Sequence, residues 1–143
     1  MIDTHIEDFA TYLESGLNLA SAMLPNPMIA VQAVSTVSNL QGLDKFPLLQ
    51  VYEEGFSGAP FNITDDLHVD YWLNSYSDQY SVNSILKWVA RDNLVELIET
   101  YFANSDRCYR LDVKRGITCK YRSGILQSTA MSCAQLEFSL IAG

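Results

Sequence analysis

The sequence predicts an α+β fold, in which an N-terminal helix and one long helix pack on an antiparallel or mixed β-sheet. Two segments place apolar residues at helical spacing, and several shorter segments alternate apolar with polar residues. Short turn-like links separate most of the alternating segments, which favours antiparallel pairing with helices on a face of the sheet. A chain of 143 residues has the size of one domain, so we expect residues 1–143 to form a single domain.

Both helices are predicted from the period of their apolar residues. Residues 3–20 place Ile6, Phe9 and Leu13 at spacings of three and four, which defines one helix face, and Pro25 follows the helix. Residues 82–103 contain no glycine or proline. The apolar stripe expected to face the core of this long helix comprises Ile85, Trp88, Val89, Leu94, Leu97, Ile98, Tyr101 and Phe102.

The strands are predicted from period-two alternation. Residues 46–54 and 66–75 read as strands, and the second has the cleanest alternation in the chain. Residues 55–64 read as a long loop, and residues 28–41 as a short helix or turn followed by a strand near 31–37.

The C-terminal part of the chain also reads as β structure. Segments 108–113 and 117–121 flank Lys114-Arg115-Gly116, which predicts a hairpin with a tight turn. Ser123-Gly124 is expected to end the second of these strands, and residues 132–141 form a last alternating strand.

Composition excludes several classes of protein. The chain is 48 % hydrophobic and 18 % charged, which is incompatible with global disorder. No run of about 18 apolar residues exists, so we expect no membrane partner. The first ten residues lack a basic start and an apolar run, so we expect no secretory signal. The three cysteines have no CxxC spacing and are expected to be reduced thiols.

Charge is unevenly distributed along the chain. The net charge is −8, yet residues 1–100 carry 3 basic and 14 acidic side chains, whereas residues 101–143 carry 6 basic and 3 acidic ones. The six basic residues lie within sixteen positions: Arg107, Arg110, Lys114, Arg115, Lys120 and Arg122. This cluster fits nucleic acid, an acidic protein surface, or a solvated sheet edge; the acidic whole disfavours nucleic acid.

Two further features are candidates for a subunit or partner interface. An acidic body with a basic end suggests head-to-tail contact between copies, in which Glu53 and Glu54 are candidate acidic groups. Phe56 and Phe61 lie in a loop that contains glycine and proline, where they meet either another subunit or their own domain.

Catalytic chemistry finds little support in the sequence. Asp66, His68 and Asp70 project to one face of a strand and could ligate a metal, although the same pattern describes an ordinary polar strand face. Glu53-Glu54 and Asp65-Asp66 are adjacent, so strand geometry separates each pair onto opposite faces. No phosphate-binding glycine loop or nucleophile motif occurs. We therefore expect no enzyme, no cofactor and no metal.

The order of the elements, with the strand FPLLQVYEEG (Phe46–Gly55), the long helix and the closing strand AQLEFSLIAG (Ala134–Gly143), resembles the tail terminator proteins of long-tailed bacteriophages, the minor tail protein U-like family. The resemblance covers roughly residues 42–143 and the first helix, whereas residues 21–41 depart from it. It implies a homohexameric ring in the tail or neck of a virion, assembled in the host cytoplasm. Such a ring caps the tail tube and stops its polymerisation.

The resemblance also implies partners. These are further copies of the chain, the tail tube protein, and a neck or head-connector protein, with DNA passing through the ring without specific binding. Two alternatives remain open at this point: a head-closure or neck connector protein of the same particle, and a small metal-dependent enzyme.

Overall fold

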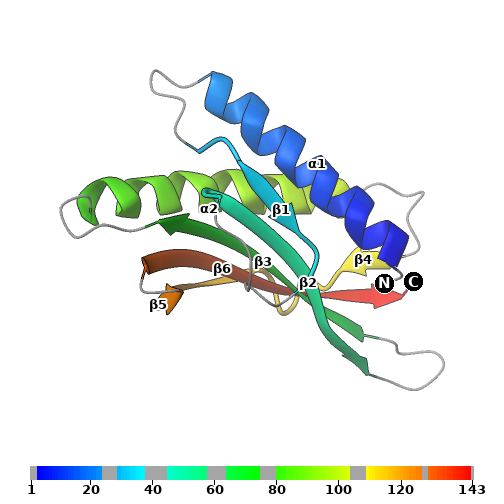
Figure 1. The fold of residues 1–143 in the computed structure, drawn as a ribbon. Helices are drawn as coiled ribbons and strands as arrows, with labels where there is room; N and C mark the ends of the chain where they lie inside the picture. The colour runs from blue at the N-terminus through cyan, green and yellow to red at the C-terminus, as the bar shows by residue number, and fades with distance from the viewer. Residues whose placement is uncertain are drawn as a thin grey trace.

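The computed structural model describes residues 3–23, 29–37, 45–57, 64–74, 80–103, 109–126 and 129–142, and it shows an α+β fold (Figure 1). Two helices accompany one mixed sheet of six strands, as the sequence predicts. In chain order the elements are α1 (Asp3–Ala22), β1 (Ala33–Ser35), β2 (Leu48–Ser57), β3 (Thr64–Asn74), α2 (Tyr80–Phe102), β4 (Tyr109–Leu111), β5 (Thr118–Leu126) and β6 (Thr129–Ala142).

The sheet has the strand order β1-β2-β3-β6, with β4 and β5 both paired to the remaining side of β6. β1 runs parallel to β2, and all other pairs are antiparallel. Leu111 of β4 lies opposite Leu140, and Thr118 of β5 lies opposite Glu137, so the two strands follow one another along β6. Together they form one interrupted edge strand.

The predicted hairpin at Lys114-Arg115-Gly116 is therefore wrong. Asp112 still donates a backbone hydrogen bond to Ser139 (2.9 Å), and Gly116 N–H then bonds back to the carbonyl of Asp112 (3.0 Å). Gly116 has φ of 67°, a left-handed conformation that favours glycine. The turn projects from the sheet edge and returns the chain to the same edge in the same direction, whereas a hairpin would reverse it.

Three other strand boundaries differ from the predictions. β5 continues through Ser123-Gly124, because Ser123 pairs with Ser132 and the β5–β6 ladder outweighs the weak strand propensity of glycine. The predicted loop 55–64 is shorter, because Gly55–Ser57 still pair with β3 beyond a register shift after Glu53. Near residues 31–37 the structure has only the three residues of β1.

Both helices cover the same face of the sheet (Figure 1). Phe9 of α1 contacts the rings of Tyr101, Phe102 and Phe138, which joins the two helices to β6. The main core comprises alternate strand residues and one face of each helix, and its fully buried members include Phe9, Leu13, Leu17, Leu49, Val51, Val69, Tyr71, Leu94, Ile98, Leu136 and Leu140.

The stripe predicted for the long helix is partly wrong. Ile85 and Trp88 are 54 % and 49 % exposed, whereas Lys87 and Ala90 are buried. The buried positions instead follow Ala90, Leu94 and Ile98 at spacings of four, which places Ile85 and Trp88 on the outward side of α2.

The helix-free face of the sheet, the side opposite both described helices, is polar yet buried. Gln50, His68, Asp70 and Gln135 are each less than 9 % exposed. A second, smaller apolar cluster lies on the same face and comprises Leu48, Trp72, Met131 and Cys133. This face therefore requires its polar groups to find partners within the protein.

Candidate functional site: a basic sheet edge beside an apolar groove

The sheet register places half of the basic cluster, three of its six residues, on one face of the edge strand. Arg110, Lys120 and Arg122 lie opposite Ile141, Gln135 and Cys133, which belong to the helix-free face. This arises because side chains alternate in β4 and β5 as they do in β6. Arg107 lies outside the described residues, and Lys114 and Arg115 lie in the projecting turn between the two strands.

Some of these cations are engaged within the chain. Arg115 Nη1 donates a hydrogen bond to Ser139 Oγ (3.2 Å) and lies 3.6 Å from Asp66 Oδ1. Lys120 Nζ lies 3.8 Å from Glu137 Oε1. These pairs are largely exposed, so each contributes little to folding stability.

Other cations of the cluster remain available. Within the described part of the chain, the side chains of Arg110, Lys114 and Arg122 form no hydrogen bond or ion pair. Arg110 and Arg122 are also exposed. A cation without an internal partner loses none of its folding contacts when it pairs with an external carboxylate.

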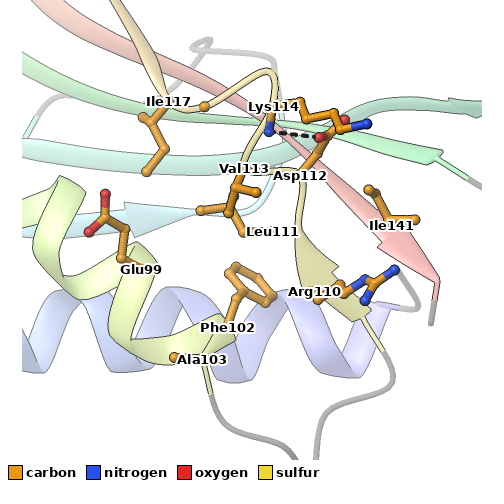
Figure 2. Close-up of a pocket in the computed structure, with 11 residues that line it drawn as sticks. Glu99, Phe102, Ala103, Arg110, Leu111, Asp112, Val113, Lys114, Ile117 and Ile141 are labelled. Carbon is orange, nitrogen blue, oxygen red and sulfur yellow. Dashed lines mark hydrogen bonds between the residues drawn. The ribbon is translucent and has the colours of Figure 1, made fainter.

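A groove of about 990 Å³ lies beside this edge, between the C-terminal end of α2 and the turn after β4 (Figure 2). Phe102 forms its α2 wall, and Leu111, Val113 and Ile117 line the opposite side. Val113 is 82 % exposed. Glu99 stands at the α2 rim, and Arg110 and Lys114 flank the outer side of β4 and the turn. The groove is thus apolar inside and charged at its rims.

Residues 29–37 precede β2 and are held in place by side chains from β3 and α1. The hydroxyl of Tyr71 donates to the carbonyl of Ile29 (3.1 Å), and Asn18 of α1 accepts from the amide of Val31 (2.8 Å). Gln32 N–H bonds to the carbonyl of Pro47 (2.9 Å), which aligns β1 beside β2.

The buried polar face contains a hydrogen-bonded network. The Tyr52 hydroxyl donates to Asp70 Oδ2 (3.1 Å), and Gln135 Nε2 donates to both of these oxygens (3.2 Å each). Burial is the main reason that the pKa of Asp70 rises to about 6. Burial and the Asp70 charge also raise the pKa of Tyr52. The network joins β2, β3 and β6 through Asp70 Oδ2, while Asp70 Oδ1 has no hydrogen-bond partner among the described residues.

His68 belongs to the same face. Its Nε2 lies 2.6 Å from Glu54 Oε2, and its ring stacks on Tyr52 with centroids 5.1 Å apart and planes at 9°. Its Nδ1 makes no hydrogen bond within the described part of the chain and lies 3.8 Å from Glu137 Oε1. His68 therefore bridges carboxylates from two strands that flank β3.

The acidic pairs of the sequence are redistributed by the strands. Glu53 and Asp65 face the helices and share a hydrogen bond, whereas Glu54 and Asp66 face the other side. Burial, assisted by Glu53, raises the pKa of Asp65 to about 6, and hydrogen bonding lowers the pKa of Glu53 despite its burial. This cross-strand pair was missed from the sequence because strand pairing, not adjacency, brings the two residues together.

The three residues considered as metal ligands, Asp66, His68 and Asp70, each contact a different partner. Asp66 accepts from Ser139 Oγ (2.6 Å), His68 pairs with Glu54, and Asp70 accepts from Tyr52. Among the described residues, no group of three or more histidine, cysteine or acidic side chains is placed to hold a metal ion.

The remaining candidates are placed only in part. Phe61 lies outside the described residues, and Phe56 is described for its backbone, which pairs with Asp65 at the end of β2. Cys119 and Cys133 are free thiols, and burial raises the pKa of each.

Acidic and basic side chains are carried by different elements of the fold. α1 carries Asp3, Glu7, Asp8 and Glu14 and no lysine or arginine. The described residues of the basic cluster lie on β4, β5 and the turn between them. α1 crosses the sheet and begins on the β4 side, where Phe9 contacts Phe102 and Phe138 (Figure 1).

No protein-family model matches the sequence, and the search of curated proteins found no match. Of the helices described, none combines the length and apolar character needed to cross a membrane.

Proposed function

We propose that the chain is a ring-forming structural protein of a phage particle that acts as the tail terminator. One observation carries the proposal: an exposed basic edge, with Arg110 and Arg122 unpaired among the described residues, belongs to a subunit whose helix α1 carries acidic side chains and no lysine or arginine. Two different and complementary surfaces on one subunit produce head-to-tail contacts, which close into rings when the rotation between subunits permits.

The internal chemistry of the described residues supports assembly rather than catalysis. The titratable groups of the helix-free face are held by partners from neighbouring strands, as Asp70 is by Tyr52 and Gln135. Hydrogen-bonded networks of this kind rigidify the sheet and favour one arrangement of its strands. The exposed described side chains include cations, acidic groups and large apolar residues such as Trp88 and Val113, which are the materials of a protein interface.

The partners follow from the same proposal. The ring would contact the tail tube on one side and a neck or head-connector protein on the other, in the virion, after assembly in the host cytoplasm. With a net charge of −8 per copy, most of the ring surface would repel DNA, which would pass through without specific binding.

Light scattering of the purified chain tests the proposal directly. We expect a hexamer, and we expect tail tubes assembled without the chain to lose their length control. A chain that stays monomeric at every concentration and does not bind tail tubes would overturn the proposal. Binding to a portal complex and not to tubes would favour the head-closure alternative.

Charge reversal identifies the surface that carries assembly. Arg110→Glu and Arg122→Glu are each expected to weaken self-association at low salt, and less at high salt, because exposed charges are screened. Lys45→Glu is the matched control, since Lys45 is exposed, changes the net charge equally and lies before β2, away from the basic edge. Equal effects of all three variants would show that only net charge matters.

A further inference from the structure

We infer that the groove between α2 and the turn after β4 receives the C-terminal end of α1 from a neighbouring copy of the chain. The inference rests on the proposed self-assembly and names the two surfaces that meet. It starts from the groove, which exposes Val113 and is lined by Phe102, Leu111 and Ile117.

The groove has the size and chemistry of a helix-binding site. About 990 Å³ accommodates several side chains, and an apolar interior with charged rims is the pattern that binds amphipathic helices through anchors at i and i+4. Glu99 stands at the rim of the α2 wall, whereas Arg110 and Lys114 flank the other wall. An occupant is therefore expected to be apolar where it enters and negative on the β4 side.

The end of α1 fits this description. Leu19 is 67 % exposed in the last turn of α1, and Met23, which directly follows the helix, is 80 % exposed. The amide of Met23 donates to the carbonyl of Ala20 (3.1 Å), which holds it against the helix end. The last turn of α1 contains no basic residue. The C-terminal carbonyl groups of a helix carry a partial negative charge, which complements Arg110 and Lys114 beside the groove, two cations that pair with no described residue.

The acidic residues of α1 extend the match. Asp8 is exposed and lies eleven residues before Leu19, which returns it to nearly the same side of the helix three turns away. A helix that turns Leu19 towards the groove would therefore turn Asp8 towards the same neighbouring subunit. This arrangement joins the apolar contact to the charge complementarity of the two surfaces.

The contact cannot form within one chain. The C-terminal end of α1 points away from β4, whereas the groove lies at the C-terminal end of α2, on the β4 side of the molecule (Figure 1). Within the subunit, α1 already packs against α2 through Gly16 and Leu97. A second copy must supply the helix end, and the two surfaces differ, so the contact is of the head-to-tail type.

Cross-linking of mixed variants tests the pairing of surfaces. Met23→Cys is mixed with a tagged Val113→Cys chain and oxidised. We expect a disulfide-linked heterodimer well above the level formed by wild-type chains, whose own cysteines set the background. Mixing Ile85→Cys with Val113→Cys is the matched control, because Ile85 is another exposed apolar residue. Equal yields from the two mixtures, or a higher yield with Ile85→Cys, would overturn the inference.

Surface variants provide an independent readout. Leu19→Asp with Met23→Asp, and separately Val113→Glu, are expected to reduce self-association at least tenfold without loss of folding, because all three side chains are exposed. Ile85→Asp is expected to leave association unchanged. If the wild type forms rings and these variants do so equally well, the groove inference is wrong while the proposed function stands. A wild-type chain that never associates would overturn both.

Discussion

The hydroxyl of Tyr52 donates a 3.1 Å hydrogen bond to Asp70 Oδ2 across the β2–β3 pair, on a sheet face that carries neither described helix. The same carboxylate oxygen accepts from Gln135 of β6. Asp70 Oδ1 has no hydrogen-bond partner among the described residues, and the side chain is buried. Ionisation of the Asp70 carboxyl is therefore costly, although its Oδ2 accepts hydrogen bonds from Tyr52 and Gln135.

Asp70→Asn is expected to change the pH dependence of stability. The folded pKa of about 6 exceeds the ordinary value of 3.8, so the folded state holds the proton more tightly. This tighter proton binding stabilises the folded state. The stabilisation is fully present below about pH 4 and is lost as the pH rises through 6, which lowers the free energy of unfolding by an amount on the order of 3 kcal/mol. The variant lacks this loss, so its stability relative to the wild type should increase from pH 4 to pH 8.

Urea denaturation at pH 4 and pH 8 measures this difference. Asp8→Asn is the matched control, because Asp8 is exposed on α1 and should show no comparable change. A difference between Asp70→Asn and wild type that stays constant over this pH range would contradict the prediction.

Tyr71→Phe is expected to destabilise the fold by about 1–3 kcal/mol. The fully buried hydroxyl of Tyr71 donates to the carbonyl of Ile29, and its removal leaves that carbonyl without this partner. Tyr12→Phe serves as control, because the Tyr12 hydroxyl forms no hydrogen bond within the described residues. Thermal or urea unfolding measures both variants, and an equal loss from each would contradict the assigned role of the Tyr71 hydroxyl.

Gly16 and Leu97 are expected to be energetically coupled. A Cβ added at Gly16 would lie 2.5 Å from Leu97 Cδ2 and 2.7 Å from Cδ1, far closer than van der Waals contact. In the Leu97→Ala background this crowding is absent, so Gly16→Ala should stabilise by about 1 kcal/mol through helix propensity. In the wild-type background, overpacking of about 1–3 kcal/mol should cancel or reverse that gain.

A double-mutant cycle measures the coupling between these two positions. Additive effects of Gly16→Ala and Leu97→Ala would show that Leu97 moves aside without cost. Leu97 is half-buried, so Leu97→Ala by itself should cost less than truncation of the fully buried Leu94, for which about 2–5 kcal/mol is expected.

Arg110 and Arg115 should respond differently to reversal of charge. Arg110→Glu removes no contact among described residues, so it should weaken assembly while changing the free energy of unfolding by less than about 1 kcal/mol. Arg115→Glu replaces the cation beside Asp66 and Asp112 with a third carboxylate, so it should also lower the stability of the subunit. Denaturation and light scattering at low and high salt separate the two effects, and identical profiles for both variants would contradict the distinction.

Local sequence patterns were sufficient for the helices and the long strands. Phe9, Leu13 and Leu17 repeat at helical spacing, and all three are fully buried. Their spacing places them on one face of α1, so their burial follows from the sequence pattern alone. The alternation of Leu67, Val69 and Tyr71 likewise places them under the helices. In both cases the period of the element dictates the direction of the side chain.

Other features required the fold. In the sequence, Ile85 and Trp88 fit the apolar stripe of α2 as well as its buried residues do. Only the packing of α2 on the sheet leaves them exposed. The turn at Lys114-Arg115-Gly116 has the composition of a hairpin, yet β6 offers one continuous edge that pairs with the strand on each side of it. Turn composition does not reveal which strand will be the partner.

The sequence by itself determined the α+β class, the two helices, the main strand faces and the uneven charge along the chain, because these depend on composition and local period. Tertiary structure alone decided that Arg110, Lys120 and Arg122 share one face at the sheet edge, that Glu53 meets Asp65, and that an apolar groove lies beside α2. Those relationships depend on strand order and register, which contacts between distant parts of the chain establish.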